Sequence, residues 1–178
     1  KYAEEHGLKN VAFLRTRIEF IESIFAEGEV SEIWITFADP QIGREKKRLT
    51  APLFMNRYRK FFKPGGIVHL KTDSRYLHEY SLAMAQQNDL KILAAGTDIY
   101  GEDRERLYSS DLFSVSGRDA VDALFQVQTF YEAQYLAQGF PITYLAFLAD
   151  HKGDYISPEW AEDQWKDEGH HFVIPSGL

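Results

Sequence analysis

The chain has 178 residues, of which 44% are hydrophobic and 15% aromatic, so it can form one folded domain and is not a disordered protein. It contains no cysteine, which excludes a disulfide scaffold and a cysteine-based zinc site. Its net charge of −7 argues against attraction of nucleic acid to the whole surface, although screening over about 8–10 Å allows a local basic patch. No apolar run is as long as a membrane span and residues 1–10 have no signal-peptide pattern, so we expect a soluble cytoplasmic protein.

Strands and helices are expected to alternate along the chain. Short apolar runs predict strands, at residues 11–14, 32–37, 67–71, 90–95 and 142–148. Helical spacing predicts helices, from about Ile18 to Gly28, from Thr50 to the turn at 63–66, from Ser74 to about Gln87 and over 120–138. Thr50 and Ser74 are the expected N-caps, and the polar stretch 97–117 is expected to be a long loop. This order indicates an α/β fold with a mostly parallel sheet and helices on both faces.

Two of these strands are followed by an aspartate. Asp39 stands before Pro40, which disfavours helical geometry at Asp39, and Asp73 follows the strand 67–71. Ligands of open α/β sheets bind at the carboxyl ends of the strands, so the two acids together indicate a binding site. Taken singly, each has an ordinary alternative, because Asp39 suits a strand-ending turn and Asp73 suits a helix cap.

Between the two acids lies a basic loop. Four cations fall within five residues, at Arg44, Lys46, Lys47 and Arg48. Such cations position a nucleic-acid backbone through its phosphates without reading the bases. The alternative is a solvated charge run, which is the commoner meaning of such a cluster.

Three further segments carry residue types that suit a functional role. The run Thr129-Phe130-Tyr131-Glu132 is expected within a helix, where it is either a base-contacting group or ordinary helix surface with one core aromatic. The acidic segment from His151 onward contains Trp160 and Trp165, and we expect it to pack on the surface because exposed tryptophan is unfavourable. The adjacent His170 and His171 do not share a helical face and do not predict a metal site.

Taken in order, the motifs TFADP, the basic loop, KRLT, KPGG, KTD and TFYE resemble those of the bacterial tRNA (guanine-N7-)-methyltransferase family, over about residues 8–150. The resemblance implies a Rossmann-like class I methyltransferase fold with strand order 3-2-1-4-5-7-6. It also implies S-adenosylmethionine as cofactor, tRNA as partner, and methylation of a guanine in the tRNA variable loop.

The resemblance also implies roles for individual residues. Asp39 matches the catalytic acid, which also contacts the cofactor. Asp73, Thr129, Tyr131 and Glu132 match substrate-binding positions. In the segment that meets the adenine of the cofactor, Arg17 holds the aligned position and Glu19 is the nearest acid. Gly43 stands where the family has a lysine, so Arg44 or Lys46 is expected to supply that cation to the substrate.

The glycine-rich cofactor loop of the family has no counterpart here, since the chain contains no Gly-x-Gly pattern. We therefore expect the first two strands of the class I sheet, roughly 50 residues or more by the size of two strand–helix units, to lie outside this sequence. Residues 1–150 would be the C-terminal part of the methyltransferase domain and 151–178 an acidic extension, and this piece alone would be inactive. The open alternatives are a non-catalytic RNA-binding remnant or subunit and a class I methyltransferase with a small-molecule or protein acceptor.

Overall fold

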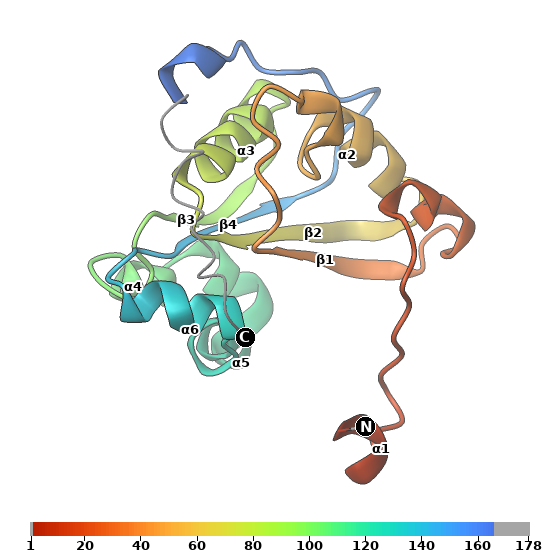
Figure 1. Ribbon diagram of the computed structural model, residues 1–178. Coiled ribbons are helices and arrows are strands. Elements are labelled where there is room, and N and C mark those ends of the chain that lie inside the picture. The colour runs from red at the N-terminus through yellow and green to blue at the C-terminus, as the bar shows by residue number, and fades with distance from the viewer. Residues whose placement is uncertain (1, 166–178) are drawn as a thin grey trace, which may run out of the picture.

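A mixed four-stranded sheet forms the centre of the protein, of which the computed structural model describes residues 2–165 (Figure 1). The strands are β1 (Val30–Thr36), β2 (Phe62–Thr72), β3 (Ile92–Gly96) and β4 (Thr143–Leu148), in the spatial order β1-β2-β4-β3. This order matches the last four places, 4-5-7-6, of the order that the family resemblance implies. The α/β fold is therefore confirmed.

One strand departs from the predicted, mostly parallel sheet. β1 and β2 are parallel, with Thr36 paired to Lys71, but β4 runs antiparallel to both β2 and β3. Three of the four strands, β1, β2 and β3, therefore share one direction. The exception, β4, could not be foreseen, because an apolar run such as 142–148 gives a strand but carries no information on its direction. The single parallel pair nevertheless brings the carboxyl ends of β1 and β2 to one edge of the sheet.

Helices cover both faces of the sheet, as predicted (Figure 1). One face packs against α2 (Pro52–Tyr58) and α3 (Arg75–Gln87), and the other against α4 (Arg104–Leu107), α5 (Asp111–Gln126) and α6 (Phe130–Ala137). Side chains alternate between the two cores along β2, where Leu70 joins the first core and Ile67 the second. The segment before the sheet holds two short helices, α1 (Tyr2–Glu5) and the 3-10 helix η1 (Ile18–Ser23).

One predicted helix cap is confirmed and the other was wrong. Ser74 caps α3, since its Oγ accepts a hydrogen bond from the Leu77 backbone at 3.1 Å. Thr50 does not cap α2, whose N-cap is Ala51. The Thr50 side chain is instead fully buried, and its Oγ1 accepts a hydrogen bond from Ser81 of α3 at 2.7 Å. Its hydroxyl is used to join two helices rather than to begin one.

The region 97–138 contains more helices than the sequence predicted. The expected loop 97–117 includes α4 and the start of α5, and the expected helix 120–138 is divided between α5 and α6. Gly117, whose φ is +79°, interrupts α5. Val127, directly after α5, has an extended backbone. The division follows from Thr129, whose side chain begins α6 as its N-cap.

The run 11–14 was expected as a buried strand and is neither buried nor a strand. Phe13 is 87% exposed and Leu14 67% exposed, and Figure 1 shows this segment leading away from the sheet. Within the described residues no strand pairs with it, and β1 lies at an edge of the sheet. Among the same residues, no helix is both long and apolar enough to cross a membrane.

Candidate active site at the carboxyl ends of β1 and β2

Asp39 and Asp73 lie at the same edge of the sheet. Asp39 follows the end of β1 by three residues, and Asp73 directly follows β2. Because β1 and β2 are parallel neighbours, both acids emerge from adjacent strand ends. Phe37 and Gln41, on either side of Asp39, both have left-handed backbones with φ of 50° and 52°. Non-glycine residues rarely adopt this geometry, and its occurrence twice around one acid is typical of a functional loop.

A cavity of about 390 Å³ opens beside Asp39. Its wall combines acidic, basic and apolar side chains, from Ile18, Glu19, Ala38, Asp39, Gln41, Lys46, Lys47, Leu49, Leu53 and Phe54. The Asp39 carboxylate is held there by its Oδ1, which accepts a hydrogen bond from the Gln41 backbone at 2.8 Å. The volume falls within the range of small-molecule and cofactor sites, about 300–1,000 Å³.

Asp73 follows the neighbouring strand β2 but is not part of the wall of this cavity. It is half-buried, and burial raises the pKa of its carboxyl group. In α6, burial is the main cause that raises the pKa of Tyr135, and the negative charge of Asp73 is the second.

The segment predicted to meet the cofactor contributes one residue to the cavity. Glu19 lines it, whereas Arg17 does not and has a side chain that is 74% exposed. The two form an ion pair at 3.3 Å. The Glu19 backbone N–H and then the Arg17 guanidinium hold the pKa of Glu19 below its usual range.

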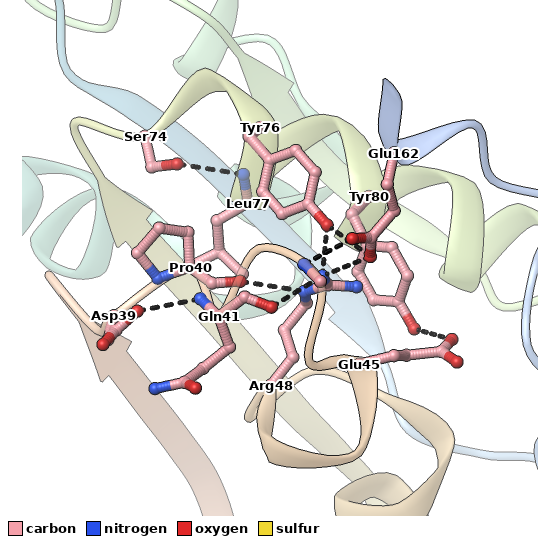
Figure 2. Close-up of polar contacts among 11 residues, drawn as sticks. Asp39, Pro40, Gln41, Glu45, Arg48, Ser74, Tyr76, Leu77, Tyr80 and Glu162 are labelled. Atoms are coloured by element: carbon pink, nitrogen blue, oxygen red, sulfur yellow. Dashed lines mark hydrogen bonds and ion pairs between the residues drawn. The ribbon is translucent and has the colours of Figure 1, made fainter. Parts of the chain in front are cut away.

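The four cations of the basic loop do not form one surface. Arg44, Lys46 and Lys47 are exposed, and Lys46 and Lys47 border the cavity. Arg48 is fully buried, so the expectation that it belongs to a phosphate-contacting cluster was wrong. Its guanidinium forms an ion pair at 3.0 Å with Glu162, from the 3-10 helix η3 (Glu162–Trp165) in the acidic segment (Figure 2).

The TFYE motif forms the start of α6. Thr129 and Glu132 make a reciprocal capping box, in which the Thr129 Oγ1 accepts from the Glu132 backbone at 3.1 Å and the Glu132 carboxylate accepts from the Thr129 backbone at 3.2 Å. The signal for this was in the sequence, because Thr-x-x-Glu is a capping-box pattern. Tyr131, between the two, is 60% exposed.

Glu132 is also the anion of a buried ion pair. It is fully buried, and its Oε1 lies 2.5 Å from the Nζ of Lys71, near the end of β2. Tyr100 donates a hydrogen bond to the same oxygen at 2.7 Å. The geometry therefore gives Glu132 an internal role that ties α6 to β2, and its contact with substrate stays a prediction.

Comparison with known proteins identifies the family. The family described as "Putative methyltransferase" matches residues 1–110. The tRNA (guanine-N(7)-)-methyltransferase of Bacteroides fragilis is 46% identical over 153 residues, covering 86% of this chain and 54% of that protein. The enzyme of the same name from Christiangramia forsetii is 50% identical over 149 residues, covering 83% of this chain and 60% of that protein. The chain thus spans about half the length of the curated relatives it matches.

Among solved structures, a "putative sarcosine dimethylglycine methyltransferase" from Galdieria sulphuraria aligns with a TM-score of 0.39 at 10% identity, over 84% of this chain and 63% of that one. The family match covers more than half of the residues, and relatives at 46% and 50% identity carry the name of the family that the motifs resemble. This chain therefore belongs to the tRNA (guanine-N7-)-methyltransferase family.

Proposed function

We propose that the protein containing this chain methylates N7 of a guanine in the variable loop of tRNA, and that this chain supplies the catalytic acid and the phosphate-binding loop. Family membership supports the reaction class. The observation that carries the assignment is the cavity beside β1, where Asp39 shares one wall with Lys46 and Lys47. Residues 1–150 would then be the methyltransferase part, with 151–178 as an extension, and the cytoplasm, where tRNA is found, would be the site of action.

Asp39 is suited to stabilise charge during methyl transfer. Guanine N7 has a free lone pair, so its attack requires no general base. As N7 forms a bond to the methyl carbon and the bond from that carbon to sulfur breaks, positive charge moves onto the guanine ring. A fixed carboxylate beside the ring stabilises that charge more in the transition state than in the ground state. The Gln41 backbone holds the Asp39 carboxylate in place for this role.

The lining of the cavity suits part of S-adenosylmethionine, which when bound supplies an electrophilic methyl group on a sulfonium ion. Its positive charge suits the carboxylate of Asp39, and its adenine suits Glu19 and the apolar wall formed by Leu49, Leu53 and Phe54. Arg17 lies beside Glu19 and would hold that carboxylate in position through their ion pair. The chain's residues would thus bind and orient the cofactor at the edge where Asp39 stands.

The tRNA would approach over the basic loop and α6. Arg44, Lys46 and Lys47 are exposed, the two lysines border the cavity, and all three would contact phosphates. Asp73 and the exposed Tyr131 would contact the guanine and its neighbours. Thr129 and Glu132 would serve this surface by fixing the first turn of α6 through their capping box.

The decisive experiment uses the full-length protein, methyl-labelled S-adenosylmethionine and two tRNA transcripts. One transcript carries guanine in the variable loop, and the other carries 7-deazaguanine there. We expect label in the first and none in the second, because the second has carbon in place of N7. Equal labelling of both transcripts, or labelling of small acceptors in place of tRNA, would reject the function, and absence of cofactor binding would indicate a non-catalytic RNA-binding protein.

A further inference from the structure

A buried arginine holds the turn that carries Asp39. The Arg48 Nε donates to the carbonyl of Pro40 at 2.9 Å, and its Nη2 donates to the carbonyl of Gln41 at 3.1 Å. Gln41 in turn donates its backbone N–H to Asp39. Figure 2 shows this connected set, with the Arg48 guanidinium lying against the turn. The orientation of Asp39 therefore depends on where Arg48 is held.

Arg48 is in turn held by the acidic segment. Its Nη2 donates to Glu162 at 3.0 Å, and Tyr76 donates to the same carboxylate oxygen at 2.8 Å. The other carboxylate oxygen of Glu162 accepts a hydrogen bond from the backbone of Gly43, within the basic loop. Although burial opposes it, the hydrogen bonds from Tyr76 and Arg48 hold the pKa of Glu162 below its usual range. Glu162 therefore contacts the loop both directly and through Arg48.

The buried positive charge of Arg48 requires its contact with Glu162. The Arg48 side chain is fully buried and stacks on the rings of Tyr80 and Tyr76, at 3.9 and 4.8 Å from their centroids. Its Nη1 has no hydrogen-bond partner within the described part of the chain. A buried cation without an anion is strongly unfavourable. Glu162 is the acidic side chain that forms an ion pair with Arg48 among residues 2–165.

Aromatic and amide contacts fix the acidic segment on α3. Trp160 packs edge-on against Tyr76 and Tyr80, with ring centroids 5.8 and 5.6 Å apart. Trp165 stacks on Trp160 at 5.9 Å. Earlier in the segment, the side chain of Asn88 both donates to and accepts from the backbone of Ile156, each at 2.8 Å. The predicted packing of this segment is therefore confirmed for its described part, while His170 and His171 lie outside the described residues.

We propose that residues 155–165 form a positioning strap, in which Glu162 acts through Arg48 and Gly43 to fix the loop 39–48 and aim Asp39 into the cavity. Arg48 and Glu162 are thus positioning residues for methyl transfer. The structural part of this proposal stands on the contacts above, and its catalytic consequence rests on the proposed function. The strap joins positions 114 residues apart in the sequence.

The test compares Glu162→Gln with Glu159→Gln in the full-length protein. Glutamine in place of Glu162 would keep the size of the side chain but lose its charge, and in either orientation it would turn an amide N–H toward a donor, either the Gly43 N–H or the Arg48 guanidinium. Glu159 is exposed on the same segment and has no described contact with the loop, so its variant controls for the loss of one charge. The first measurement is tryptic cleavage after Arg44, Lys46 and Lys47, with fragments identified by mass spectrometry.

We expect Glu162→Gln to speed cleavage in this loop about tenfold, because cleavage follows local opening, while other sites are cut at wild-type rates. The second measurement separates kcat from KM. We expect kcat to fall about tenfold, equivalent to about 1.4 kcal/mol, and KM for tRNA to rise by a smaller factor, because Lys46 and Lys47 lie in the loosened loop. Glu159→Gln should match the wild type in both.

Each outcome decides one claim. Loop cleavage and kcat at the level of the Glu159→Gln control would overturn the strap, and so would a general increase in cleavage at all sites, which indicates only lost stability. Selective loop cleavage in a protein that does not methylate tRNA would uphold the strap as a structural device and reject the proposed function.

Discussion

The loop 39–48 and the turn 127–132 that begins α6 both carry motifs of the family, but their acids have opposite environments. Asp39 is exposed on the wall of a cavity, whereas Glu132 is fully buried against Lys71. A family motif therefore identifies an exposed acid at Asp39 and a buried acid with a structural contact at Glu132. The comparison predicts that changes in the first region affect methylation, and that changes at Glu132 affect stability.

The largest effect is expected at Glu132. Glu132→Ala leaves the Lys71 ammonium buried without its carboxylate, so we expect the free energy of unfolding to fall by about 3–5 kcal/mol. Glu132→Gln keeps the capping box and should be less destabilising by about 1 kcal/mol. Denaturant unfolding of the full-length protein measures both, with Gln134→Ala on the exposed side of α6 as a control within about 0.5 kcal/mol. A stable Glu132→Ala protein with lost tRNA binding would instead make Glu132 a substrate contact.

Asp39→Asn should have the next largest effect, and on rate rather than stability. The amide oxygen of asparagine can still accept the Gln41 backbone hydrogen bond, so the turn is kept and only the charge is lost. We expect kcat to fall about 100-fold, as for other groups that stabilise transition-state charge, with tRNA affinity unchanged. Single-turnover methylation and filter binding measure the two quantities. Turnover at the wild-type rate would remove Asp39 from the chemistry.

These two regions also show what the sequence could reveal. The helix after Ser74 was predicted correctly because its cap and its buried Leu77, Tyr80 and Met84 are local features. The Thr-x-x-Glu capping box was equally local, but its position inside a longer helical pattern hid it. The ion pair of Arg48 with Glu162 could not be predicted, since no spacing rule connects residues 114 apart.

The run 11–14 shows another limit of prediction from the sequence. Its apolar character predicted burial, but burial of a strand depends on a neighbour that the run itself cannot specify. The placement of Asp39 and Asp73 was predictable for the opposite reason. Once two consecutive strands are parallel, their following residues must emerge at one edge.

A third effect concerns the approach of tRNA to the loop. The double variant Lys46→Glu, Lys47→Glu should weaken tRNA binding about tenfold or more at low salt. Because two phosphate contacts are lost, the negative slope of log K against log salt concentration should decrease in magnitude by about 1.4–1.8. Lys63→Glu with Lys152→Glu makes the same change in net charge on exposed residues beside the start of β2 and after β4. Equal losses in both double variants would mean that total charge, and not the loop, attracts the RNA.

The smallest effect is expected at Asp73, which directly follows β2. Burial raises its pKa, so the folded protein favours the protonated form, and the stability associated with this group is present below the unfolded pKa of about 3.9 and is lost as pH rises through the folded pKa. Asp73→Asn cannot ionise and avoids this loss. We therefore expect it to be as stable as the wild type at low pH and slightly more stable at neutral pH, by less than about 1 kcal/mol, while methylation falls.

Unfolding curves from pH 3 to pH 7 measure this difference, with the exposed Asp119→Asn as the matched control. A gain in stability together with a loss of methylation is the pattern of a residue kept for function at a cost to the fold. Loss of both would place Asp73 with Glu132 as an internal anchor, and the substrate side of the site would then consist of the loop 39–48 and the exposed face of α6.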